Sequence, residues 1–138
     1  MSPFRPFAIG AAAIALFSAA YLTGRHAVYA QSQYQMNMDA YKEFQKSDKE
    51  LNVVYRQLIK KYSTDDTGDA ATRKKIVASE RAWIRYRDAE ADAEASVDVE
   101  GGSMYPMEYS TDAAILTDDR IKKLKVLMKG SQVGGPNP

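Results

Sequence analysis

The sequence predicts an all-α fold, a small antiparallel three-helix bundle whose first helix is long. Apolar residues recur at spacings of three and four along three segments, which is the period of an amphipathic helix. Two clusters of turn-forming residues separate these segments, and no stretch of useful length alternates as a strand would. With 138 residues, 45% of them hydrophobic, the chain can build one core. Short connections between consecutive helices favour the antiparallel arrangement.

The first thirty residues have a different composition and predict a signal peptide over 1–30. Arg5 gives a basic start, and Phe7–Leu22 is a run of sixteen residues without charge. That run is shorter than the roughly 20 residues of a membrane-spanning helix. Small residues permit cleavage after Ala20 or Ala30, and we favour Ala30 because a polar chain follows it. The protein is then periplasmic or secreted, with no stable membrane insertion after cleavage; an uncleaved membrane anchor is the alternative.

The remaining chain, a helical domain at 31–129 and a flexible tail at 130–138, has neither cysteine nor histidine, since His26 lies in the predicted signal peptide. It keeps 17 of the 19 basic side chains against all 18 acidic ones. Thiol nucleophiles, serine–histidine pairs and histidine–cysteine zinc sites are therefore excluded. We expect no enzyme activity, no catalytic residue, no cofactor and no metal site. The near-neutral charge also argues against a nucleic-acid partner.

The first helix is predicted over residues 33–62. Its apolar stripe is Tyr34, Tyr41, Phe44, Leu51, Tyr55, Leu58 and Tyr62. Lysines and glutamates occupy the other faces, and the turn cluster at residues 63–68 ends the helix.

The second helix is predicted over residues 69–97 and the third over 111–129. The apolar side of the second is Ile76, Val77, Trp83, Ile84, Tyr86 and Ala91, and that of the third is Ala113, Leu116, Ile121, Leu124, Leu127 and Met128. Two glycines and Pro106 place a long loop between them, at 101–109.

Charged residues also fall within these inward stripes. Asp48 continues the stripe of the first helix, Arg87 lies four residues after Trp83, and Arg120 lies four after Leu116. A buried charge is costly unless it is paired. We therefore expect a structural polar network in which Asp48 pairs with Arg87 or Arg120.

Charge is unevenly distributed along the chain. The segment from Asp88 to Asp119 holds ten acidic residues and no basic one, and basic residues flank it. Such a patch would steer a basic partner; the alternative is a solvated face balanced by neighbouring helices. Glu90 and Glu94, like Asp88 and Asp92, are neighbours four residues apart on one helix. Two carboxylates could hold calcium or hydrolyse glycosides, but the calcium-loop signature is absent and such acids are usually solvated.

The glycine-led loop adds adaptable contact residues to this acidic segment. Its alternative role is a lid that folds back on the bundle. The candidate partner-binding residues are Asp98, Glu100, Ser103, Met104, Tyr105 and Glu108.

Five segments in order resemble the LprI-like lysozyme-inhibitor family: Met36–Ala40, Asp48–Tyr55, Arg81–Asp88, Gly101–Pro106 and Leu116–Arg120. The resemblance implies a small helical protein of the cell envelope and, by the family's name, an inhibitor of lysozyme. With the acidic segment, it leads us to expect that the loop and nearby acidic residues occlude the cleft of a basic lysozyme-type muramidase. The alternative is a structural or adaptor protein of the envelope with no enzyme target. Family members commonly have cysteines where this chain has Asp39, Ala91 and Asp112, so this is a variant without disulfides.

Overall fold

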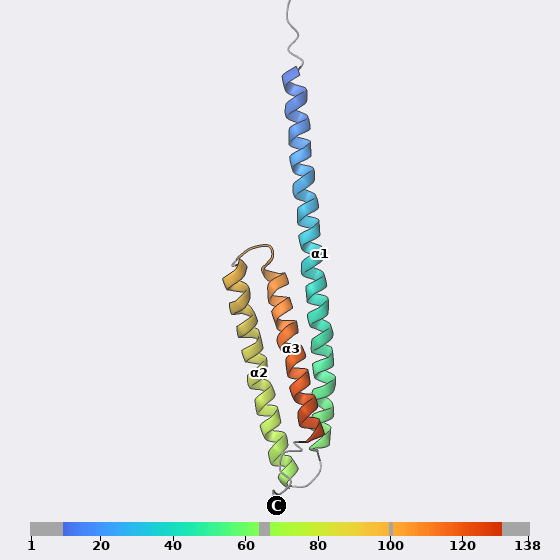
Figure 1. Ribbon diagram of the computed structural model, residues 1–138, viewed down its shortest axis with the longest axis vertical. Helices are drawn as coiled ribbons and strands as arrows, with labels where there is room; N and C mark the ends of the chain where they lie inside the picture. Colours follow the sequence, from blue (N-terminus) through green and yellow to red (C-terminus); the bar gives the residue numbers. More distant parts are fainter. Residues whose placement is uncertain (1–9, 64–66, 100, 131–138) are drawn as a thin grey trace, which may run out of the picture. The chain divides into compact units, whose positions relative to one another are not determined.

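The computed structural model describes residues 10–63, 67–99 and 101–130, and it contains three helices with no strand in that part of the chain. They are α1 (Gly10–Lys61), α2 (Thr67–Val99) and α3 (Tyr105–Lys129). The chain divides into two units between Gln35 and Met36, and the bundle belongs to the second unit. There α2 and α3 form a helical hairpin beside the C-terminal half of α1 (Figure 1). The predicted all-α three-helix fold is confirmed.

Helix α1 begins earlier than the sequence predicted. It starts at Gly10 instead of residue 33 and continues past Ala30, the predicted cleavage point. Beyond that point Tyr34 is 64% exposed to solvent. None of the described helices is long and apolar enough to cross a membrane. Signal cleavage stays a prediction, and residues 1–9 of the predicted signal lie outside the described residues.

The hydrophobic core joins the C-terminal part of α1 to the C-terminal half of α3. Its fully buried members are Leu51, Val54, Leu58, Ile121 and Leu124, and the partly buried side chains against them are Tyr55, Tyr62, Ile76, Trp83 and Met128. Burying such aliphatic side chains is worth about 1.5–3 kcal/mol each. Packing of these residues is therefore the main source of stability in a chain without cysteine.

Several aromatic and aliphatic residues assigned to the inward stripes are exposed instead. They are Tyr34, Tyr41, Ile84, Tyr86 and Leu127, with exposures between 39% and 64%. The inward positions of α2 are Ile76, Glu80, Trp83, Arg87, Ala91 and Ala95. Glu80 and Arg87 are charged, so a search for apolar residues alone does not find them. The predicted stripe of α2 therefore included Ile84 and Tyr86, which lie on neighbouring, exposed faces.

The connection between α2 and α3 is shorter than the predicted loop. It ends at Met104, and Pro106 lies in the first turn of α3 instead of inside a loop reaching residue 109. Proline suits this position because its fixed φ is helical and the first-turn N–H groups lack helical partners. The turn closes through Gly102 N donating to Val99 O (2.9 Å). Gly101 has a φ of 67°, a left-handed conformation that glycine adopts without strain.

Candidate functional site

The first charged cluster inside the bundle is centred on Arg87. Its side chain is only 9% exposed, and its Nη1 donates to Asp48 Oδ1 at 3.0 Å. Its Nη2 lies 2.8 Å from Asp88 Oδ1. The guanidinium also stacks over the rings of Phe44 and Trp83, with centroid distances of 5.0 and 5.3 Å. Two carboxylates and two ring faces therefore replace the water that this buried cation loses.

The second cluster pairs Arg120 with Glu80. Nε and Nη2 of Arg120 both donate to Glu80 Oε2, at 2.9 and 2.8 Å, and the two side chains are 12% and 6% exposed. Arg120 also lies over the Trp83 ring at 5.5 Å. Asp48 was expected to pair with Arg87 or Arg120. In the structure Asp48 pairs with Arg87, and Arg120 pairs with Glu80 instead. The sequence analysis did not name Glu80, although its place between Ile76 and Trp83 in the inward series was the available signal.

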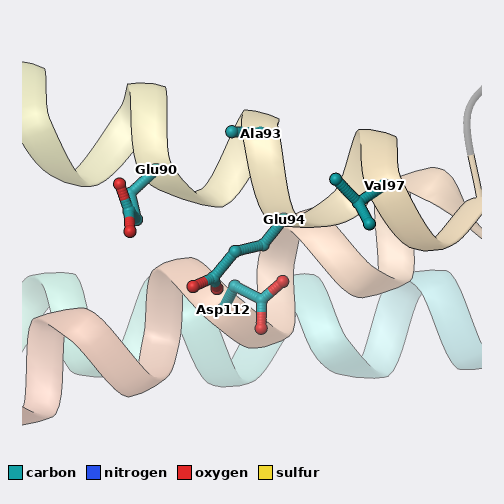
Figure 2. Close-up of a pocket in the computed structure, with 5 residues that line it drawn as sticks. All are labelled: Glu90, Ala93, Glu94, Val97 and Asp112. Atoms are coloured by element: carbon teal, nitrogen blue, oxygen red, sulfur yellow. The ribbon is translucent and has the colours of Figure 1, made fainter.

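A small acidic cavity lies between the C-terminal half of α2 and the start of α3. We call it the acidic groove; it has a volume of about 340 Å³ and is lined by Glu90, Ala93, Glu94, Val97 and Asp112. Figure 2 shows the carboxylates of Glu94, from α2, and Asp112, from α3, close together, with that of Glu90 further along α2. Val97 is 85% exposed at the other end of the groove. This combination suits a lysine or arginine side chain of a partner. Its charged head would contact the carboxylates, and its aliphatic stem would pack against Val97.

The candidate residues of the glycine-led loop lie at the end of the hairpin near this groove. Ser103 and Met104 are in the turn, whereas Tyr105 and Glu108 are in α3. The Ser103 carbonyl accepts a hydrogen bond from Asn37 Nδ2 of α1 at 3.0 Å, which ties the turn to α1. Met104 is 38% exposed and available for contact. Of the other candidates, Glu100 and the side chain of Asp98 lie outside the described residues.

Two tyrosines of α3 bring hydroxyl donors to the acidic side chains of α2. Tyr105 Oη donates a hydrogen bond to Asp92 Oδ1, and this bond raises the pKa of Tyr105. Burial, and then the charge of Asp88, raises the pKa of Tyr109. Both phenols therefore stay protonated at neutral pH. In the part of the chain that the structure describes, no three acidic or histidine side chains are grouped so as to hold a metal ion.

The sequence could not place the acidic groove. Glu90 and Glu94 were recognised as neighbours on one helix, but their approach to Asp112 depends on the register of the α2–α3 hairpin. That register places Ala91, Ala95 and Ala113 at full burial, so that small side chains let the two helices approach closely. Val97 was missed because a single exposed valine near a helix end has no periodic signal.

Comparisons with known proteins agree with this architecture. Residues 25–124 match the model of the family described as lysozyme inhibitor LprI. An uncharacterized protein of Rhizobium meliloti (strain 1021) is 34% identical over 110 residues, which cover 75% of this chain and 78% of that protein. The crystal structure of a DUF1311 family protein from Pseudomonas putida KT2440 is similar, with a TM-score of 0.59 and 29% identity over 71% of this chain and 93% of that one. The chain belongs to the LprI lysozyme-inhibitor family.

Proposed function

We propose that this protein is exported and inhibits a lysozyme-type muramidase, with the acidic groove and the adjoining turn as its contact surface. The observation that carries the proposal is the convergence of Glu90, Glu94 and Asp112 beside exposed Val97, in a chain whose family is that of a lysozyme inhibitor. Lysozymes are typically strongly basic proteins. A concentrated acidic surface would speed their association and favour one orientation of docking.

The proposed mechanism is occlusion of the enzyme's cleft. The turn with Ser103 and Met104 lies at the end of the bundle and would approach the cleft first, while the groove receives a basic side chain from its rim. Asn37 and Asp92 hold the two sides of this turn through Ser103 and Tyr105. A turn fixed in this way loses little conformational entropy on binding. Inhibition then requires no chemistry by the protein, only exclusion of the substrate.

The proposal is tested by measuring lysozyme activity on cell walls with the domain from residue 31 onward, at two salt concentrations. We expect inhibition that weakens as salt rises, because the association is electrostatic. Glu90→Gln combined with Glu94→Gln should weaken binding roughly tenfold, since two charges leave the contact surface.

The matched control is Glu43→Gln combined with Glu50→Gln, which changes the net charge equally on exposed positions of α1. It should leave inhibition unchanged. A domain that neither binds lysozyme nor slows cell-wall digestion would remove the proposal, and equal losses in both double variants would remove the groove from it.

A second candidate is a structural or adaptor protein of the cell envelope, and the exposure of tyrosines on α1 favours it. Tyr34 and Tyr41, which follow the predicted cleavage point, are 64% and 45% exposed. Exposed tyrosines are common in protein interfaces because they offer large contact areas at low entropic cost. Under this function Tyr34→Ala and Tyr41→Ala would abolish capture of an envelope partner and leave any effect on lysozyme unchanged.

A further inference from the structure

The antiparallel packing of the bundle gathers basic residues at the end opposite the turn between α2 and α3. Helix α1 ends with basic residues at 56–61, and the first half of α2 and the last part of α3 are also basic. The ends of α1 and α3 lie side by side, since Lys61 Nζ donates to Met128 O at 2.6 Å. Acidic and basic surfaces therefore occupy opposite ends of the second unit, which the near-neutral net charge conceals.

A hollow lies along one face of α2 at the basic end. The hollow, which we call the basic groove, has a volume of about 520 Å³ and is lined by Ala70, Arg73, Lys74, Val77, Ala78 and Arg81. Arg73, Lys74 and Arg81 are exposed, and none of the three has an ion-pair partner among the described residues. Nearby Lys122 and Lys125, by contrast, pair with Asp119 and Glu50 at 2.8 and 2.7 Å. Among the described residues, the groove therefore presents three exposed cations that form no ion pair.

The shape and chemistry of the basic groove define the ligand it fits. Arg73 and Arg81 are separated by eight residues, or roughly 12 Å along the helix axis at 1.5 Å per residue. Guanidinium groups bind phosphate oxygens in bidentate fashion, so this row suits several phosphates in succession. A row of cations along one helix, beside a hollow, suits a chain that lies along the helix better than a flat membrane surface. None of the described residues that line the groove is aromatic, so they offer no platform on which nucleic-acid bases could stack.

We propose that the basic groove binds a linear phosphate-bearing polymer without bases, which it recognises through the phosphates alone. This site is separate from the acidic groove and does not depend on the inhibition of lysozyme. It would hold the protein on a polyanion while the acidic end remains open to a basic partner.

The test is titration of the full chain, kept in a non-ionic detergent, with long-chain inorganic polyphosphate as the probe. Binding should occur, and its logarithm should fall linearly with the logarithm of salt concentration as counterions are released. The triple variant Arg73→Gln, Lys74→Gln, Arg81→Gln should bind at least tenfold more weakly and show a smaller salt slope. Arg73→Lys combined with Arg81→Lys keeps the charge but removes the bidentate contacts, so its affinity should lie between those of the unaltered chain and the triple variant.

The matched control is Lys42→Gln, Lys46→Gln, Lys49→Gln, which removes three exposed cations from α1. Its affinity for polyphosphate should stay within about twofold of that of the unaltered chain, because the site is local. Equal losses in the two triple variants would overturn the proposal and leave only attraction by net charge. A single-stranded oligonucleotide that binds more tightly than polyphosphate, or anionic vesicles that bind where polyphosphate does not, would also overturn it.

Discussion

Trp83 contacts two arginines inside the bundle. Its ring centroid is 5.3 Å from the guanidinium carbon of Arg87 and 5.5 Å from that of Arg120. Arg87 of α2 pairs with Asp48 of α1, and Arg120 of α3 pairs with Glu80 of α2. The indole therefore gives both guanidinium groups an aromatic face in addition to their carboxylate partners. This arrangement joins all three helices through side chains of opposite charge and one aromatic ring.

The two ion pairs should differ in their contribution to stability. In Asp48→Ala, Arg87 keeps Asp88 as a partner and Asp48 is itself 41% exposed, so we expect a loss of about 1 kcal/mol. In Glu80→Ala, Arg120 stays buried with no carboxylate in the pairs observed, and we expect a loss of about 3–5 kcal/mol. Urea unfolding of the two variants measures both values.

Glu80→Gln serves as the control for that comparison, because it keeps an acceptor oxygen at the same place and should be less destabilising than the alanine variant. The smaller effect expected for Asp48→Ala follows from the second carboxylate partner of Arg87, Asp88. A larger loss from Asp48→Ala than from Glu80→Ala would contradict this account.

Tyr105 gives the turn region a dependence on alkaline pH. Its pKa is raised above the usual 10.0, chiefly by the hydrogen bond to Asp92. A phenol whose pKa is raised by folding contributes stability that is complete below pH 10 and is lost as pH rises through the folded-state pKa. Tyr105→Phe should therefore be less stable than the unaltered protein at pH 8, and the difference should shrink above pH 10. Tyr86→Phe, at a position that is 51% exposed, is the control; a constant difference across this pH range would contradict the role of the hydrogen bond.

At the scale of elements, the turn between α2 and α3 decides where the candidate contact residues lie. Its closure at residues 101–104 places Tyr105 and Glu108 on a rigid helix, where the sequence predicted a loop. Pro106 was expected to lie in the loop that follows α2, but it lies in the first turn of α3. The hydrogen bond from Asn37 to Ser103 then connects the turn to α1.

Gly101 sets the geometry of this turn through its backbone alone. Its φ of 67° disfavours residues with a Cβ, although a Cβ there would meet no atom within 4 Å. Gly101→Ala should therefore cost about 1–2 kcal/mol through backbone strain and not through a clash. Ser103→Ala, in the same turn, should change the free energy of unfolding by less than about 0.5 kcal/mol. Thermal unfolding of both variants tests the assignment, and equal stability of the two would contradict it.

At the scale of the whole chain, charge segregation is the property that links structure to function. A net charge of +1 describes the full sequence, yet the second unit carries the acidic groove at one end and the basic groove at the other. Association with a basic enzyme and with a phosphate polymer should each weaken with salt, and each should respond to substitutions in its own groove. The lysozyme inhibition assay and the polyphosphate titration described above therefore test this charge segregation directly.

The sequence by itself determined the helical class, the three helices and the separation of acidic from basic segments. Helical periodicity and turn residues are local signals, so they can be recognised in the sequence without knowledge of tertiary contacts. It also indicated that Asp48, which falls within the inward stripe of α1, needs an arginine partner. It misjudged Tyr34, Tyr41 and the other exposed apolar residues because only packing determines which side of a helix is covered.

Only the tertiary structure decided which partners meet. The register of the α2–α3 hairpin brings Glu94 to Asp112, and the packing of all three helices gives Arg87 to Asp48 and Arg120 to Glu80. These pairings join residues far apart in the chain, and no local preference specifies them. The opposite ends of the bundle became acidic and basic for the same reason, because antiparallel packing adds the charges of segments that the sequence keeps apart.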